Sequence, residues 1–95
     1  MYKDLLIEKI DSKSAVVGII GLGYVGLPLV IRFSEEGFRV IGFDIDEEKV
    51  QKLNNGDSYL IHIPSSAITD AAINGFTATS DWIRISNCDV ILICV

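Results

Sequence analysis

The sequence predicts an α/β fold in which four parallel strands form a sheet in the order 3-2-1-4, with helices on its faces. Three observations support this prediction. Short apolar runs alternate with segments of helical periodicity, a pattern typical of parallel sheets with right-handed crossovers. The first apolar run, residues 15–20, leads directly into Gly21-Leu-Gly-Tyr-Val-Gly26. The second run, residues 38–43, is closed by Asp44.

The residue pattern in the first part of the chain predicts a helix, a strand and a second helix. Residues 2–10 have apolar side chains at four-residue spacing and predict a short amphipathic helix, which a polar link at residues 11–14 follows. Residues 15–20 are almost continuously apolar, as expected of a parallel strand covered on both faces. A helix is predicted at residues 23–36, and Gly37 supplies a natural stop.

The second half predicts three further strands and three further helices. Asp46 is expected to cap the first of these helices, and Ser65 or Ser66 the second. In chain order, the ranges are a strand at 38–43, helices at 47–54 and 65–74, a strand at 76–79, a short helix at 80–87 and a strand at 88–95. In the predicted order the last strand is an exposed apolar edge, which favours self-association.

Composition excludes several classes of function. The chain has 95 residues, enough for one small domain, and a formal net charge of −5, which gives no general attraction to nucleic acid or to an anionic membrane. Its apolar runs are shorter than the roughly 20 residues of a membrane span. The first ten residues carry charges among their apolar side chains, unlike a secretory signal. A cytoplasmic location is therefore expected.

The other reactive or aromatic side chains are predicted to have structural rather than catalytic roles. Cys88 and Cys94 lie in one predicted strand, roughly 20 Å apart, too far for a disulfide, and are expected to be reduced core thiols. Phe76 and Trp82 are assigned to the core rather than to cofactor stacking, and His62 to a loop or the surface. The sequence contains no pattern that defines a catalytic constellation or a metal-ligand cluster.

The glycines after the first strand predict a dinucleotide site. Gly21 permits a sharp turn, Gly23 lets the backbone approach a pyrophosphate, and Gly26 lets the helix pack close to the strand. Tyr24 and Val25 supply unpaired N–H groups of the first helical turn, at the positive end of the helix dipole. The Tyr24 ring either covers the ligand or packs outward.

The acidic residue after the second strand completes this pattern. The Asp44 carboxylate is placed to accept hydrogen bonds from the adenosine-ribose hydroxyls, and it would repel a 2′-phosphate. No arginine follows Asp44 immediately, so the predicted cofactor is NAD rather than NADP. Lys49 either lies over the ribose, neutralises a phosphate, or is a solvated lysine beside Glu47 and Glu48.

Several motifs together resemble one enzyme family. They are Gly-Leu-Gly-Tyr-Val-Gly-Leu-Pro-Leu, Gly42-Phe-Asp-Ile-Asp46 with Lys49-Val50, Leu53-Asn-x-Gly56-x-Ser-Tyr59 and Cys88-Asp-Val-Ile-Leu-Ile-Cys-Val95. Together they are similar to the N-terminal domain of the nucleotide-sugar dehydrogenases, the UDP-glucose/GDP-mannose dehydrogenase family. The Leu-Pro-Leu segment and the helix ahead of the first strand look most like the branch that oxidises UDP-N-acetylhexosamines for surface polysaccharides.

The resemblance carries further implications. It implies that the full-length enzyme, a homo-oligomer, performs two successive NAD-dependent oxidations at the sugar C6 of a UDP-sugar. The cysteine thiol that holds the intermediate lies beyond Val95 in the family. The resemblance also implies that residues 21–26, Leu22 included, bind the pyrophosphate, that Asp44 binds the ribose, and that Val95 begins a loop approaching the cofactor. Residues 1–14 are then a helical lead and 15–95 a truncated Rossmann fold, inactive alone, with the identity of the UDP-sugar open.

Two alternatives remain from the residues alone. One is the NAD-binding domain of another two-domain dehydrogenase, such as a β-hydroxyacid type. The other is a stand-alone nucleotide-binding or regulatory module without chemistry. The length of the parent gene and a downstream cysteine motif would separate them.

Overall fold

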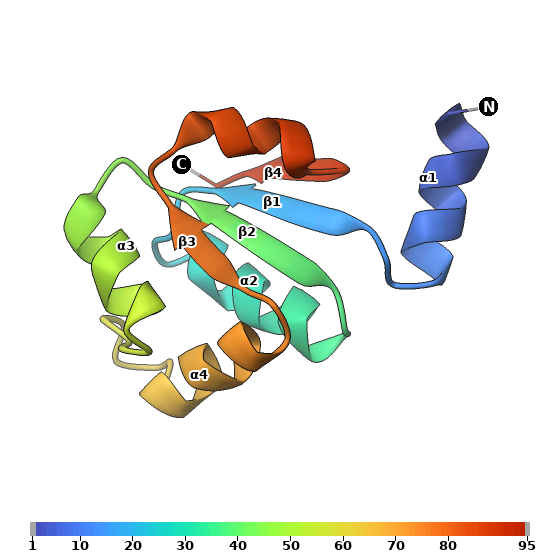
Figure 1. Ribbon diagram of the computed structural model, residues 1–95. Helices are drawn as coiled ribbons and strands as arrows, with labels where there is room; N and C mark the ends of the chain where they lie inside the picture. The colour runs from blue at the N-terminus through green and yellow to red at the C-terminus, as the bar shows by residue number, and fades with distance from the viewer. Residues whose placement is uncertain (1, 95) are drawn as a thin grey trace.

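The computed structural model describes residues 2–94 and contains one parallel sheet with helices around it (Figure 1). The elements in chain order are α1 (Tyr2–Asp11), β1 (Val16–Ile20), α2 (Gly26–Glu35), β2 (Arg39–Phe43), α3 (Glu47–Asn54), α4 (Ser65–Ile73), β3 (Thr77–Thr79), the 3₁₀ helix η1 (Trp82–Asn87) and β4 (Val90–Ile93).

The four strands are parallel and lie in the order β3-β2-β1-β4, as the sequence predicts. Val17 of β1 is paired with Val40 of β2 on one side and with Val90 of β4 on the other. Because all four strands run the same way, the loops that follow them meet at one edge of the sheet. The two edge strands are β3 and β4.

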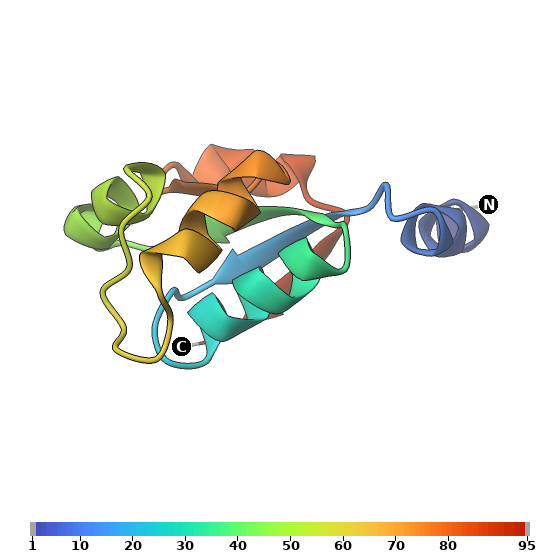
Figure 2. The same cartoon turned by 90° about the horizontal axis from the view of Figure 1, so that it is seen from below.

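The two faces of the sheet are covered unequally. Helices α2, α3 and α4 bury one face, where the main apolar cluster includes Val17, Ile19, Leu27, Val30, Val40, Leu53 and Ile68. The opposite face carries Phe43, on which Trp82 of η1 stacks, so η1 covers that side. Figure 2 shows α1 standing apart from this layered body, joined to β1 by a short connection.

Capping residues account for several helix ends. The Asp46 carboxylate accepts hydrogen bonds from the N–H groups of Glu48 and Lys49, as predicted for the start of α3. Gly37 and Gly56 adopt positive φ angles of 96° and 83° directly after α2 and α3. These glycines end their helices in the left-handed conformation that other residues avoid.

Three boundary predictions are wrong. Helix α2 begins at Gly26 because residues 23–25 form the turn that precedes it. The N-cap of α4 is Pro64 rather than Ser65 or Ser66, and the Ser65 hydroxyl accepts a hydrogen bond from the N–H of Ser58 instead. The last strand is shorter than residues 88–95, since Cys88 still caps η1.

Candidate functional site

The predicted site residues meet at the edge where the strands end. A cavity of about 310 Å³ opens there, between the turn after β1, the end of β2, the start of η1 and the end of β4. Its lining residues are Ile20, Gly21, Leu22, Gly23, Phe43, Asp44, Ile45, Lys49, Trp82 and Cys94. Ligands of open α/β sheets bind outside the carboxyl ends of the strands, so this cavity has the expected position.

The three glycines have different steric surroundings. Gly21 has φ of 96°, and its N–H donates to the carbonyl of Phe43 at 2.8 Å, which fixes the turn to β2. A Cβ on Gly26 would lie 1.7 Å from the Gly21 carbonyl oxygen, so the close packing predicted for Gly26 is confirmed. A Cβ on Gly23 would meet no atom within 4 Å. The backbone at Gly23 is therefore open to an approaching group.

The start of α2 presents unpaired donors beside that opening. Within residues 2–94, the N–H groups of Gly23, Tyr24 and Val25 have no hydrogen-bond acceptor, and α2 has no side-chain cap. Unpaired N–H groups and the helix dipole together favour an anion such as a diphosphate. Tyr24 is 85% exposed and is not part of the cavity lining, which favours an outward orientation of its ring.

Asp44 is bound to the backbone on two sides. One carboxylate oxygen accepts from the N–H of Leu22 at 2.9 Å, and the other accepts from the N–H of Asp46 at 2.9 Å. An ionised carboxylate offers about four acceptor positions, so two remain for ligand hydroxyls. A ribose diol is the kind of group that this half-buried carboxylate fits.

Tyr59 does not line the cavity but holds the glycine turn, a role that the sequence does not reveal. Its hydroxyl donates a hydrogen bond to the carbonyl of Leu22, whose N–H is bound by Asp44. Burial raises the pKa of Tyr59 above its ordinary value, and the carboxylates of Asp44 and Asp46 raise it further. The phenol therefore stays protonated and keeps donating to the turn.

Lys49 lies within the cavity. Its ammonium is 5.6 Å from the centroid of the Tyr59 ring, a cation–π distance. Among the described residues it makes no ion pair with Glu47 or Glu48, and its side chain is half-buried. This position favours the two interpretations that place Lys49 at the ligand, over the ribose or near a phosphate, and both stay predictions.

The core assignment of Trp82 is also wrong, whereas that of Phe76 is confirmed. Trp82 is 39% exposed and lines the cavity. It immediately follows the loop after β3, at the same sheet edge as Asp44. That topological position is the signal that could have identified it. Four further lining residues were not identified from the sequence: Ile20, Phe43, Ile45 and Cys94.

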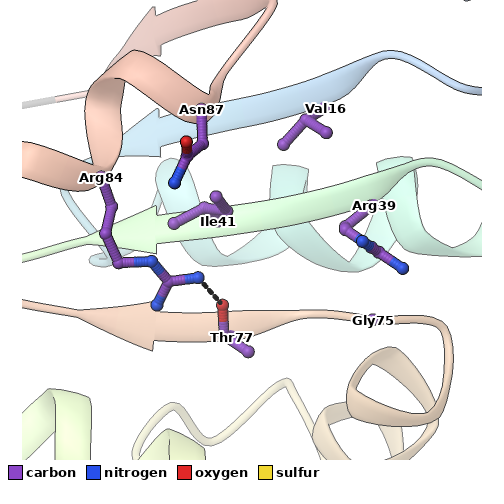
Figure 3. Close-up of a pocket in the computed structure, with 7 residues that line it drawn as sticks. All are labelled: Val16, Arg39, Ile41, Gly75, Thr77, Arg84 and Asn87. Carbon is purple, nitrogen blue, oxygen red and sulfur yellow. Dashed lines mark hydrogen bonds between the residues drawn. The ribbon is translucent and has the colours of Figure 1, made fainter.

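A second cavity, of about 350 Å³, lies away from all of these residues (Figure 3). It is on the face covered by η1, toward the amino ends of β1 and β2, and is lined by Val16, Arg39, Ile41, Gly75, Thr77, Arg84 and Asn87. Arg84 donates to the Thr77 hydroxyl at 3.1 Å. It shares no residue with the predicted site, and it lies at the end of the sheet opposite to the usual ligand position.

The remaining reactive side chains are dispersed. Both cysteines are free, as predicted, and burial raises the pKa of the Cys88 thiol. His62 is exposed in the loop between α3 and α4. The described part of the chain contains no cluster of three or more His, Cys, Asp or Glu residues that could hold a metal. None of its helices has the length and apolar character needed to cross a bilayer. Val95 lies outside the described residues.

Comparison with known proteins gives a consistent result. Residues 15–95 match the family described as UDP-glucose/GDP-mannose dehydrogenase family, NAD binding domain. The chain is 34% identical over 84 residues, 88% of its length, to UDP-N-acetyl-D-mannosamine dehydrogenase of Methanococcus vannielii. It is 33% identical over 79 residues, 83% of its length, to UDP-N-acetyl-D-glucosamine 6-dehydrogenase of Salmonella typhi.

Solved structures show the same similarity. UDP-D-ManNAc dehydrogenase from Pyrococcus horikoshii superposes with a TM-score of 0.78 at 29% identity, over 84% of this chain and 20% of that one. The aligned regions make up 19% of the Methanococcus protein and 18% of the Salmonella protein. The chain thus spans about a fifth of the length of these relatives.

Proposed function

The chain belongs to the UDP-glucose/GDP-mannose dehydrogenase family, and from this membership we propose that its cavity at the carboxyl edge of the sheet binds the NAD of a UDP-N-acetylhexosamine 6-dehydrogenase. NAD is the cofactor of this domain type. When bound, NAD supplies a hydride acceptor. Residues of this chain hold and orient it.

The proposal is carried by two neighbouring features. The backbone at Gly23 is open to an approaching group, and the Asp44 carboxylate, although it accepts two backbone hydrogen bonds, still has free acceptor positions. The unpaired N–H groups around Gly23 receive the pyrophosphate, with no Cβ in the way. The free acceptor positions of Asp44 receive the ribose hydroxyls. Lys49, beside both groups, adds positive charge near the phosphates or the ribose.

The sugar chemistry is proposed from the relatives. Two of them are dehydrogenases of UDP-N-acetyl-D-mannosamine and UDP-N-acetyl-D-glucosamine. We place the full-length protein in the same class: it oxidises the C6 alcohol of a UDP-N-acetylhexosamine to a carboxylate in two NAD-dependent steps, for surface polysaccharide synthesis. A cytoplasmic homo-oligomer is the expected form of that enzyme.

Residues 15–95 form its partial NAD-binding domain in this proposal, and residues 1–14 form a helical lead. The 95 residues alone bind NAD without turning over a sugar. Two of the reactive side chains lie apart from the cavity, which supports this: His62 is exposed in a loop and Cys88 is placed against η1. Cys94 lines the cavity and is assigned no catalytic role in this proposal.

Two measurements test the proposal. Isothermal titration of the 95-residue chain should show saturable NAD binding, at least about tenfold tighter than NADP binding, because a 2′-phosphate would face the Asp44 carboxylate. Equal affinity for the two would contradict the role of Asp44. The full-length protein should produce two NADH for each UDP-N-acetylhexosamine oxidised. A single NADH, from a hydroxy acid substrate, would overturn the sugar assignment.

A further inference from the structure

The cavity contains an aromatic wall that the sugar-dehydrogenase assignment does not explain. Trp82 is the first residue of η1, and its indole stacks on the Phe43 ring with centroids 5.6 Å apart and planes 22° apart. Phe43 is fully buried at the end of β2, so it is a fixed support. The Asp81 carboxylate, which accepts from the N–H of Ile83, also fixes the start of η1.

Strand order places the lining residues in a definite sequence along the edge of the sheet. Trp82 follows β3, Asp44 follows β2, Gly21 follows β1 and Cys94 follows β4. The strands are neighbours in the order β3-β2-β1-β4. Asp44 therefore lies between Trp82 and the glycine turn.

This order determines how a dinucleotide can lie in the cavity. The pyrophosphate occupies the turn after β1, and the adenosine ribose occupies Asp44 after β2. The base attached to that ribose must then continue away from the turn, toward β3 and Trp82. The other half of the dinucleotide must run in the opposite direction, past Cys94 and β4.

We propose that the indole of Trp82 packs against the adenine ring of the bound NAD and is a cofactor-positioning residue. This inference rests on the proposed function. Phe43 supports one side of the indole, and the exposed remainder faces the cavity. The exposed apolar side chain of Ile45, which also lines the cavity, limits contact of the base with water.

Trp82 is the only tryptophan of the chain, which makes the test direct. With excitation of tryptophan, NAD and AMP should each change the emission of the 95-residue chain saturably, whereas nicotinamide mononucleotide should not. Trp82→Leu should lower the affinity for both NAD and AMP by about tenfold in isothermal titration, since base–aromatic stacking is lost. Trp82→Phe should retain most of the affinity, and Ile83→Ala, at a neighbouring exposed residue, should change it little.

The outcomes separate this inference from the proposed function. NAD binding by the unchanged chain with no change in tryptophan emission, or a folded Trp82→Leu that binds as tightly as the unchanged chain, would overturn the role of Trp82 alone. An emission change with nicotinamide mononucleotide but not with AMP would mean that the nicotinamide half, not the adenine half, lies at Trp82, and would also overturn the role of Trp82. If Trp82→Leu does not fold, the emission changes of the unchanged chain and the NAD affinity of Trp82→Phe test the role of Trp82. Absence of NAD binding by the unchanged chain would overturn both proposals.

Discussion

The carboxylate of Asp44, at the end of β2, accepts a hydrogen bond from the backbone N–H of Leu22, in the turn after β1, at 2.9 Å. The carbonyl of the same Leu22 accepts from the hydroxyl of Tyr59. Both polar groups of one residue in the glycine turn are therefore fixed by side chains from other parts of the chain. Asp44 thus shapes the glycine turn, the proposed phosphate site, in addition to its proposed contact with ribose.

Asp44→Ala should reduce both stability and cofactor affinity. The side chain of Leu22 is fully buried, and loss of the carboxylate leaves its N–H unpaired, which should lower the free energy of unfolding by about 1–3 kcal/mol. NAD affinity should fall as well, because the ribose loses its acceptor. Urea unfolding and isothermal titration measure the two effects. Asp57→Ala, an equal charge change at an exposed residue, is the control, and equal stability of both variants would contradict the structural role of Asp44.

The glycines at 23 and 26 should respond differently to the same substitution. Gly26→Ala should destabilise the protein by more than about 2 kcal/mol, because the new Cβ would meet the Gly21 carbonyl oxygen at 1.7 Å. The Cβ of Gly23→Ala would meet no protein atom within 4 Å. The free energy of unfolding should therefore change by less than about 1 kcal/mol, while NAD affinity falls. Thermal unfolding with and without NAD compares them. A Gly23→Ala protein that binds NAD normally would show that the phosphates do not approach Gly23.

Local patterns predicted most of this architecture. The alternation of apolar runs with helical segments was sufficient for the strand order, and the N-cap of α3 followed from Asp46 and the residues after it. These features depend on residues close in sequence or on general rules of chain topology. The predicted turn after β1 formed for the same reason.

Long-range packing produced what the sequence did not predict. Tyr59 contacts Leu22 across 37 residues, and no short motif records that pairing. Ser65 does not cap α4 because Pro64 takes the extended N-cap conformation, which leaves the hydroxyl for Ser58. Trp82 was assigned to the core on its residue type alone, although its place after β3 directs it to the ligand edge.

The Tyr59 hydroxyl should make stability depend on pH in the alkaline range. Burial and the two nearby carboxylates raise the pKa of Tyr59 in the folded state above its ordinary value of 10.0. The folded state then holds the proton more tightly than the unfolded state, so this contribution to stability is complete below about pH 10 and is lost as the pH rises further. Urea unfolding between pH 8 and pH 11 should show a steeper loss for the unchanged protein than for Tyr59→Phe. Tyr24→Phe, at an exposed ring, should keep the steep loss; the same slope in Tyr59→Phe would refute this account.

Asn54 should contribute more stability than the neighbouring Asn55. The Asn54 amide donates to the carbonyl of Ala78 at 2.8 Å and accepts from the N–H of Ala78 at 3.0 Å, so it pairs with the free edge of β3. Asn54→Ala should lower the free energy of unfolding by about 1–3 kcal/mol, since Ala78 is buried. Asn55→Ala removes an exposed amide of the same size and should cost less than about 1 kcal/mol. Equal losses would mean that the β3 edge does not depend on this amide.

The apolar edge at β4 should promote self-association. Ile93 is 70% exposed on β4, whose outer side has no strand partner among residues 2–94. An exposed apolar edge strand can pair with a second copy, and a lysine there opposes such pairing by charge repulsion and desolvation. Ile93→Lys should therefore reduce the concentration dependence of the sedimentation coefficient. Ile73→Lys places the same charge at an exposed isoleucine of α4 and should leave association unchanged, because α4 is a helix and presents no strand edge to a second copy. If both variants dissociate the protein alike, net charge rather than the β4 edge controls association.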